Sequence, residues 1–274
     1  MKEITKSNIK SLLKAREENS NKNNYGHALI IAGNKGKMGA AVIAATACLR
    51  SGVGLLTVCV PQEERFILQT CIPEAMLIMR EDKPYNLHKF MAMCIGPGIG
   101  IDDHSKSILI DMMTEFNHPL LLDADALTIL SADKKLLDRF PENTIITPHH
   151  LEFDRLFGTH TDADDRIETA VKKAKEHHII IVLKSNKTVI VTPDEIFHNN
   201  TTGNSGLAKG GSGDALTGII TSFLAQGYTS LNASIIGVYI HGLAADITLN
   251  EQSKESMLIT DVIKNLGTAF KSIN

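Results

Sequence analysis

Short apolar runs alternate along the chain with longer segments of helical periodicity. Most of the short runs are apolar on both faces, which is typical of strands buried inside a parallel sheet. Strands that alternate with helices are the signature of β-α-β units. The pattern therefore predicts an α/β protein, a three-layer α/β/α sandwich around a mainly parallel central sheet.

The predicted elements follow one another from residue 27 onward. We expect strands at residues 27–32, 55–60, 91–95, 119–123, 144–147, 179–184 and 188–192. We expect helices at about residues 39–51, 103–116, 150–157 and 164–177, and three more between residue 212 and the C-terminus. The stretch KSNKT at 184–188 separates two strands closely enough to predict a hairpin. No linker or repeat interrupts this order, so we expect a single domain over residues 1–274, with residues 1–24 as a polar, helical extension.

Composition and charge narrow the range of partners. A net charge of -3 and a pI near 6.4 provide no basic field for a phosphate backbone or an anionic membrane, so we expect neither nucleic acid nor a membrane as partner. No apolar run approaches the roughly 20 residues of a membrane-spanning helix. The cysteines show no C-x-x-C pairing, and we expect buried thiols in the reducing cytoplasm at Cys48, Cys59, Cys71 and Cys94.

The residues that directly follow the predicted strands are rich in glycine and polar side chains. They are GNKGKMGA at 33–40, GPGIG at 96–100, DAD at 123–125, TPH at 147–149 and Lys184. In open α/β sheets, ligands bind outside the carboxyl ends of the strands, so we expect these residues to line one site. Neither glycine run has the spacing of a P-loop or of a dinucleotide-binding fingerprint.

The most informative segment is residues 204–218, NSGLAKGGSGDALTG, a glycine-rich loop that leads into an apolar helix. Unpaired backbone N–H groups of Gly211, Ser212 and Gly213 at such a helix start can hold a phosphate, and the helix dipole favours the anion. Asp214, beside that phosphate, suits a general base that takes a proton from a substrate hydroxyl. The alternative is an ordinary first-turn acid that stabilises the helix by about 0.3–1 kcal/mol. The complete run GGSGDALTG favours the catalytic role.

Other polar side chains that directly follow the predicted strands each allow two interpretations. Asp123 and Asp125 can hold Mg²⁺ through water, or Asp125 can cap the following helix. Lys184 can bind a nucleotide phosphate, or it can be a charged strand end. His149 and His150 are neighbours at a helix start that point apart and lack a third ligand, so we do not expect this pair to bind a metal.

Seven motifs occur together and in order: HALIIAGNKGKMGAA, RSGVGLLTV, GPGIG, LLLDADAL, TPHHLEF, VLKSNKT and TTGNSGLAKGGSGDALTG. With these motifs the chain resembles, from Tyr25 onward, the ADP/ATP-dependent NAD(P)H-hydrate dehydratase family of the ribokinase-like superfamily. The resemblance implies a ribokinase-like fold and a repair reaction on hydrated NADH or NADPH (NADHX or NADPHX). In that reaction a nucleotide phosphorylates the hydroxyl of the damaged ring, and loss of phosphate restores the ring double bond.

The resemblance also implies roles for individual residues. Those that would contact the hydrated dinucleotide are Ala40, Gly98 or Gly100, His149 and Asp214. Gly211, Ser212 and Gly213 would hold the transferred phosphoryl group. Those that would contact the adenine nucleotide are Lys184, Ser185, Asn186, Lys187, Thr188 and Gly213. The resemblance further implies ADP or ATP as phosphoryl donor, Mg²⁺ as cofactor and a homotetramer.

The chain departs from this family at two points. His150 and Leu151 replace the Pro-Gly that usually follows the TPH histidine, so the geometry near His149 can differ. Only about 25 polar residues precede the first predicted strand, whereas a domain needs at least roughly 50. We therefore expect the epimerase, often fused N-terminally in this family, to be a separate chain.

Two other functions fit parts of the pattern. A ribokinase-like vitamin kinase for hydroxyethylthiazole, hydroxymethylpyrimidine or pyridoxal shares the GSGD segment but needs a tighter pocket than the two glycine loops indicate. A non-catalytic nucleotide-binding regulator would keep the glycine amides and Lys184 but has no need of the Asp214 carboxylate. The sequence therefore favours the dehydratase.

Overall fold

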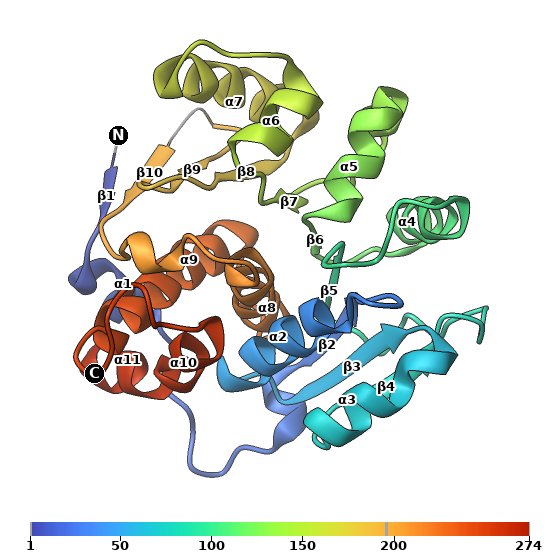
Figure 1. Cartoon of the computed structure of the whole chain (residues 1–274), viewed down its shortest axis with the longest axis horizontal. Helices are drawn as coiled ribbons and strands as arrows, with labels where there is room; N and C mark the ends of the chain where they lie inside the picture. Colours follow the sequence, from blue (N-terminus) through green and yellow to red (C-terminus); the bar gives the residue numbers. More distant parts are fainter. Residues whose placement is uncertain (1, 195–196, 274) are drawn as a thin grey trace.

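The computed structural model describes residues 2–194 and 197–273, and the ten strands within these ranges form a single sheet in the order β1-β10-β9-β8-β7-β6-β5-β2-β3-β4 (Figure 1). The strands are β1 (Lys2–Ile4), β2 (His27–Ile31), β3 (Leu55–Val60), β4 (Met76–Met79), β5 (Ala92–Ile95), β6 (Leu120–Leu122), β7 (Ile145–Ile146), β8 (Ile180–Leu183), β9 (Val189–Val191) and β10 (Phe197–Asn200). The helices are α1 (Lys6–Leu12), α2 (Met38–Arg50), α3 (Arg65–Cys71), α4 (Asp103–Glu115), α5 (Asp125–Ala132), α6 (His150–Phe157), α7 (Ala163–His177), α8 (Ser212–Ala225), α9 (Ser230–Thr248), α10 (Ile259–Lys264) and α11 (Leu266–Ile273).

From β8 to β4, each strand is parallel to the next one in the sheet, which confirms the mainly parallel sheet. β9 runs antiparallel to both β8 and β10, and β1 pairs in parallel with β10. The antiparallel pairing of β8 with β9 confirms the hairpin predicted at 184–188. All the predicted strands are present, with each end within one residue of its predicted position.

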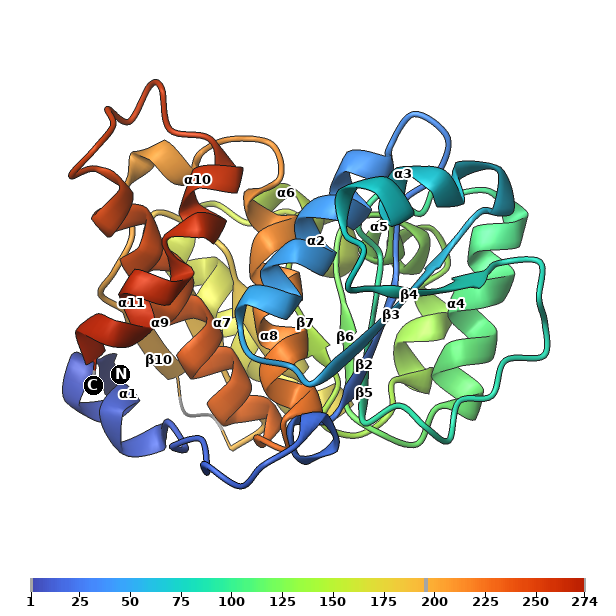
Figure 2. The same ribbon diagram turned by 90° about the horizontal axis from the view of Figure 1, so that it is seen from below.

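Helices cover both faces of the sheet and give the three predicted layers (Figure 1). Helices α2, α8 and α9 cover one face, and α10 and α11 pack on α9 further from the sheet (Figure 2). Helices α4 to α7 cover the other face. Strand β2 shows how one strand serves both cores: Ala28 and Ile30 belong to the first, whereas Leu29 and Ile31 belong to the second, because successive side chains of a strand point to opposite faces.

Helix α8 lies close against α2 because Gly218 has no side chain. A Cβ at that position would lie 2.0 Å from the carbonyl oxygen of Ala44 on α2. Both helices are strongly apolar, and the contact between them is fully buried. This packing fixes the direction in which the N-terminus of α8 points.

The chain changes direction in the sheet between β2 and β5. Strands β2 and β5 are parallel neighbours, but the chain leaves β2 into α2 on one face and leaves β5 into α4 on the other. Such a switch opens a crevice outside the carboxyl ends of the two strands. The glycine loops 33–37 and 96–100 follow these two strands and flank the crevice.

Several elements differ from the expectation. Strands β1, β4 and β10 and helices α3 and α5 lie outside the predicted ranges. In the described part of the chain from Ser212 onward there are four α-helices rather than three. The N-terminal segment contains the expected helix, but it also contributes β1 to the sheet, and Ile4 and Ile9 are buried in the core. β1 and β10 are short and mostly polar, so no apolar run reveals them.

The cysteines follow the expectation only in part. Cys48, Cys59 and Cys94 are buried free thiols, and burial raises the pKa of each. Cys71 is exposed, so the prediction of burial was wrong there: it is the last residue of α3, a helix that buries Leu68 alone. No described helix is both long enough and apolar enough to cross a membrane.

Candidate active site

The N-terminus of α8 provides backbone donors at the crevice. Gly211 precedes the helix in the left-handed conformation, and no side chain caps it. The amide of Ser212 donates to the carbonyl of Lys209, so the prediction that this N–H is unpaired was wrong. Within the described residues, the amides of Gly213 and Asp214 have no backbone acceptor. Two N–H groups at the positive end of the helix dipole can thus receive an anion.

Asp214 carries an unusually basic carboxylate in this first turn. Burial, followed by the negative charges of Asp123 and Asp125, raises its pKa from 3.8 to about 6, while the positive charge of Lys184 opposes the rise. The carboxylate is thus ionised at neutral pH and yet a far better proton acceptor than an ordinary aspartate. A pKa raised in this way is characteristic of catalytic acids and bases.

Lys184 and Asp123 form an ion pair beside this base. The ammonium of Lys184 lies 2.8 Å from one oxygen of Asp123, and the hydroxyl of Thr217 on α8 donates to the other oxygen at 2.7 Å. Burial alone would lower the pKa of Lys184, but the carboxylates of Asp123 and Glu152 outweigh burial and raise it. The lysine therefore stays positively charged although its side chain is only 19% exposed.

The Lys184 ammonium also lies against the phosphate-binding turn. A Cβ at Gly213 would come within 3.1 Å of its Nζ atom. An anion held by the amide of Gly213 would thus meet the lysine as well. Of the predicted phosphate ligands, Gly213 and Lys184 thus lie close together.

Asp125 is the first residue of α5 and not its N-cap, which is Ala124, so the capping interpretation was wrong. Its carboxylate instead accepts the N–H of Gly100 at 2.9 Å and pairs with Lys37 at 3.2 Å. It therefore ties the loop after β5 to the loop after β2. Within the described residues, no three His, Cys, Asp or Glu side chains are grouped so that they could hold a metal.

The buried side chain of Arg80 joins the same two loops. The sequence did not indicate this role. Its guanidinium donates to the carbonyls of Ala32 and Gly33 in the first loop and to that of Ile99, at 3.3 Å, in the second. The residue is 3% exposed. Asn34 adds a further bond from its side-chain amide to the carbonyl of Ile99. An arginine after a short apolar run carries no sequence signal for this role.

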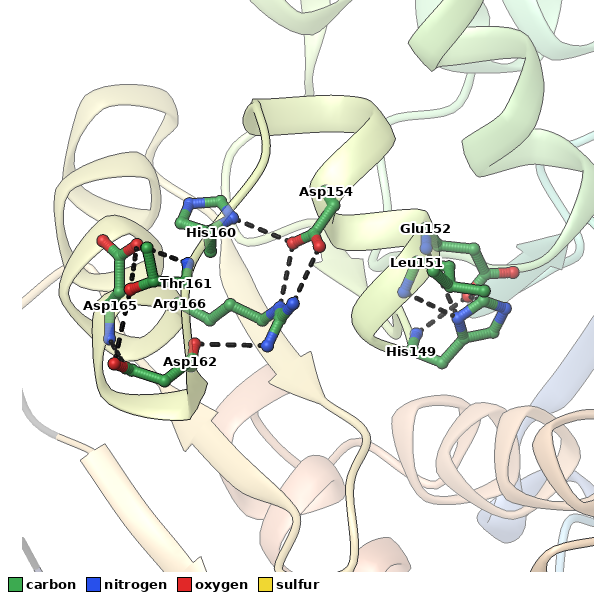
Figure 3. A network of polar contacts seen from close by, with 9 residues as sticks. All are labelled: His149, Leu151, Glu152, Asp154, His160, Thr161, Asp162, Asp165 and Arg166. Atoms are coloured by element: carbon green, nitrogen blue, oxygen red, sulfur yellow. Dashed lines mark hydrogen bonds and ion pairs between the residues drawn. The ribbon is translucent and has the colours of Figure 1, made fainter.

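His149 is the N-cap residue of α6, and its side chain caps the helix (Figure 3). Its Nδ1 atom accepts the N–H groups of Leu151 at 3.1 Å and Glu152 at 3.3 Å, and the Glu152 carboxylate accepts the N–H of His149 at 2.8 Å. With His150 and Leu151 in place of Pro-Gly, the chain passes directly into the helix. Figure 3 also shows Asp154 of α6 paired with Arg166 of α7 at 2.8 Å, which holds the two helices together.

A cavity of about 770 Å³ lies in front of α8. Of the predicted site residues, it is lined by Asp123, His149, Lys184, Ser185, Asn186, Thr188, Ser212, Gly213 and Asp214. The lining does not include the predicted residues Gly211, Asp125 and Lys187. It also does not include Ala40 at the start of α2, nor Gly98 and Gly100 in the loop after β5. The lining also includes Thr202, Asn204 and Leu207 of the motif at 201–218, together with Asn200, Val238 and His241, which the sequence did not indicate.

Two other missed residues shape the loop that leads into α8. Asp246 accepts the N–H of Gly203 at 2.8 Å and the side-chain amide of Asn204 at 2.9 Å. Lys209 donates to the carbonyls of Glu255 and Met257, both at 2.6 Å. Contacts between segments so far apart in the chain leave no local pattern in the sequence.

Comparison with known proteins agrees with this geometry. The family model Carb_kinase, NAD(P)H-hydrate dehydratase, matches residues 28–267. An ADP-dependent (S)-NAD(P)H-hydrate dehydratase from Neisseria meningitidis is 38% identical over 86% of this chain and 81% of that protein. A bifunctional NAD(P)H-hydrate repair enzyme from Moorella thermoacetica is 33% identical over 98% of this chain, but the chain spans only 54% of that protein.

A solved structure extends the match to the whole chain. It is the ADP/ATP-dependent NAD(P)H-hydrate dehydratase from Bacillus subtilis, co-crystallized with ATP and Mg²⁺. It superposes with a TM-score of 0.89 at 30% identity and covers 100% of this chain and 99% of that chain. The chain therefore has the ribokinase-like fold and belongs to the NAD(P)H-hydrate dehydratase family.

Proposed function

We propose that the protein catalyses the nucleotide-dependent dehydration of NADHX or NADPHX to NADH or NADPH. The observation that carries this proposal is the Asp214 carboxylate, which lines the cavity beside two unpaired helix amides and has a pKa of about 6. Such a base is ionised near neutral pH and can accept the proton of a substrate hydroxyl. A first-turn acid that only stabilised the helix would not need a second, buried carboxylate beside it.

The chemistry takes two steps. The ring hydroxyl gives its proton to Asp214 while its oxygen attacks the terminal phosphorus of ADP or ATP, and the bond from that phosphorus to the rest of the nucleotide breaks. The C–O bond of the phosphorylated ring then breaks, and its electron pair leaves with phosphate. The neighbouring ring carbon loses a proton, and its C–H electron pair forms the ring double bond. The products are the reduced dinucleotide, phosphate, AMP or ADP, and one proton.

The role of the surrounding groups follows from charge. Phosphoryl transfer concentrates negative charge on the phosphoryl oxygens, and preorganised donors stabilise that charge. The amides of Gly213 and Asp214 and the ammonium of Lys184 are placed to do so. Because Asp123 neutralises Lys184 in part, the site accepts an anion without carrying a large excess of positive charge.

The cavity and the adjoining loops offer two arms on either side of Asp214. We assign the arm with Lys184, Ser185, Asn186 and Thr188 to the adenine nucleotide, with Lys187 at its edge. The Asp125 side has the glycine loops with Ala40, Gly98 and Gly100, and we assign it to the hydrated dinucleotide. Charges of both arms, from Lys184 and from Asp125, act on Asp214, which supports its position between them.

We propose that Mg²⁺ enters with the nucleotide. Mg²⁺ typically keeps several waters and uses one or two carboxylates together with substrate phosphates, so a site without three grouped ligands fits a nucleotide-borne ion. Asp123 and Asp125 are the carboxylates nearest to Asp214 that could reach it through water. When bound, the ion neutralises part of the phosphate charge.

Two features of the cellular setting complete the proposal. We assign the enzyme to the cytoplasm, which the buried thiols of Cys48, Cys59 and Cys94 support. We expect a homotetramer, as measured by light scattering of the purified protein.

The test is a direct assay with hydrated NADPH, Mg²⁺ and either ADP or ATP. The return of reduced-nicotinamide absorbance is followed together with phosphate release, with a nucleotide-free reaction and the Asp214→Asn variant as controls. Nucleotide-dependent recovery that the variant lacks supports the dehydratase and identifies the donor. Phosphorylation of a vitamin alcohol without recovery of the dinucleotide would assign the protein to the vitamin kinases instead.

A further inference from the structure

The hydrogen bonds of His149 determine where its ring carries a proton. Its Nδ1 atom accepts two backbone N–H groups, from Leu151 and Glu152 (Figure 3). A nitrogen that accepts such bonds directs its lone pair at the donors and carries no hydrogen. A neutral imidazole has one N–H, so in His149 that hydrogen is on Nε2.

The same bonds keep the ring neutral. A proton on Nδ1 would face two N–H groups and the positive end of the α6 dipole, and both interactions are repulsive. Burial is the largest cause of a lowered pKa of His149, and the positive charge of Lys184 adds to it. The charged or titratable groups around the ring are Lys184, His150 and Arg155, which lower the pKa, Asp123, which raises it, and the Glu152 carboxylate at 3.6 Å from Nε2.

The Nε2–H group remains available to a ligand. Within the described residues it makes no hydrogen bond, and Glu152 Oε2, at 3.6 Å, is too far for a good one. The side chain is 43% exposed and lines the cavity with Asp214 and Lys184. His149 follows β7 and forms a backbone bridge with Lys184, so the two side chains rise from adjacent strand ends.

We propose that His149 is a neutral hydrogen-bond donor that holds an oxygen on the reacting ring of the hydrated dinucleotide, first the hydroxyl and then its phosphate ester, and that it does not serve as a base. This proposal rests on the proposed function. A neutral donor stabilises charge on that oxygen without competing with Asp214 for the hydroxyl proton. The two side chains thus have different roles: Asp214 accepts the proton of the hydroxyl, and His149 donates a hydrogen bond from Nε2.

Two variants separate this role from the capping of α6. His149→Asn keeps an oxygen near the position of Nδ1, and Asn is a preferred N-cap, but it has no donor at the position of Nε2. His149→Gln places an amide N–H near Nε2 but lacks a favourable cap. We expect the Asn variant to keep the wild-type melting temperature and lose about 10²-fold in kcat, as when one preorganised donor is removed. We expect the Gln variant to melt lower and yet recover part of kcat.

The opposite ranking would overturn the proposal. If the Asn variant keeps wild-type kcat, the Nε2–H group does not act in the reaction. If activity falls only in step with melting temperature across the two variants, the role of His149 is confined to the cap.

A second measurement needs no substrate. Nitrogen-15 NMR of the histidine rings in the full-length, ligand-free protein distinguishes a protonated from an unprotonated ring nitrogen. We expect Nδ1 without and Nε2 with hydrogen at neutral pH, and a pKa below the ordinary value of 6.5. A ring with hydrogen on Nδ1 would overturn the inference even in an active dehydratase. An inactive wild-type protein with the expected tautomer would overturn the proposed function and, with it, the assigned acceptor, but not the tautomer.

Discussion

The ammonium of Lys184 lies 2.8 Å from the carboxylate of Asp123, and these residues directly follow β8 and β6, the two strands that flank β7. Thr217 on α8 donates to the second oxygen of Asp123, so the pair links two strand ends to the catalytic helix. Lys184 and Asp123 act on Asp214 with opposite sign: the aspartate raises its pKa and the lysine lowers it. The strength of the base is therefore set by a pair of charges that have no local relation in the sequence.

The first prediction concerns the pH dependence of the reaction. The base form of Asp214 is lost as the pH falls through about 6, so kcat/KM should fall along an acid limb with that midpoint. Asp214→Asn should lower kcat by about 10²–10⁴-fold above this midpoint, and the difference from the wild type should shrink in acid, where the wild type loses its base as well. Steady-state kinetics over a pH series measure both effects. A variant with wild-type kcat, or a wild-type profile flat through this range, would contradict the assignment of the base.

The second prediction uses the two charges beside Asp214. Asp123→Asn removes a charge that raises the pKa of Asp214, so the acid limb should move to lower pH. Lys184→Met removes a charge that lowers this pKa, so the limb should move to higher pH, and the Kd of the nucleotide should rise. Lys264→Met, at a side chain that is 72% exposed, serves as the control. Shifts in the same direction for both variants would show that structural damage, not charge, controls the limb.

The third prediction is a gain of stability on loss of the base. The pKa of Asp214 is higher in the folded protein, about 6, than its ordinary value of 3.8. Folding therefore favours the protonated carboxyl, and the stability it contributes is present below the ordinary value and lost as the pH rises through about 6.

Asp214→Asn cannot ionise and should thus be more stable than the wild type at neutral and alkaline pH, by at most about 3 kcal/mol. The difference should disappear in acid, where both side chains are neutral. Urea unfolding at several pH values measures it. A variant less stable than the wild type at alkaline pH would mean that the carboxylate makes favourable contacts that outweigh its burial.

The sequence predicts the buried strands of the sheet well, and it does not reveal β1 and β10 at one side of the sheet. Strands such as β3 and β5 are apolar runs inside a parallel sheet, where burial on both faces demands apolar residues throughout. Strand β1 buries only Ile4 of its three residues, and its pairing with β10 joins segments from opposite parts of the chain. Such edge strands depend on tertiary pairing and leave no periodic pattern.

A similar limit applies to the site. Asp214, His149 and Lys184 could be named because each follows a strand or opens a helix at the predicted rim. The sequence does not predict their interactions. Histidine is not among the preferred N-cap residues, so nothing in the sequence indicates that the ring of His149 caps α6. The sequence predicts an unpaired N–H group at Ser212, because the hydrogen bond from this group to the carbonyl of Lys209 depends on the turn that precedes α8.

The fourth prediction tests the packing that aims α8 at the site. In Gly218→Ala the new Cβ would lie 2.0 Å from the carbonyl oxygen of Ala44, so α2 and α8 must move apart. Overpacking of this kind costs about 1–3 kcal/mol or more. Gly267→Ala in α11 is the matched control, because nothing lies within 4 Å of its Cβ and helix propensity alone favours alanine. Thermal unfolding should rank Gly218→Ala below the wild type and Gly267→Ala at or above it; equal stability of the two variants would exclude a tight contact.

The last prediction concerns the buried charge of Arg80. Within the described residues, its guanidinium has no carboxylate within ion-pair distance, and its hydrogen bonds go to the carbonyls of Ala32, Gly33 and Ile99. A buried guanidinium is costly unless its donors are satisfied, and here the acceptors of its two terminal nitrogens belong to the two loops assigned to the dinucleotide, whereas its Nε finds no partner within the described residues. Arg80 should therefore act as a positioning residue for that arm of the site.

Arg80→Met would leave these carbonyls without their donor, at a cost of about 1–3 kcal/mol for each that finds no other partner. We expect kcat/KM for the hydrated dinucleotide to fall roughly 10–100-fold through displacement of the loops, while the Kd of ADP stays at its wild-type value. Arg80→Lys, which keeps the charge but not the planar fork, should behave like Met if geometry decides and like the wild type if charge does. Arg65→Met, on exposed α3, controls for the loss of an arginine as such. An equal loss of dinucleotide and nucleotide binding would show general unfolding of the site, since the hydrogen bonds of the Arg80 guanidinium within the described residues go to the backbone that leads into or forms the loops of one arm.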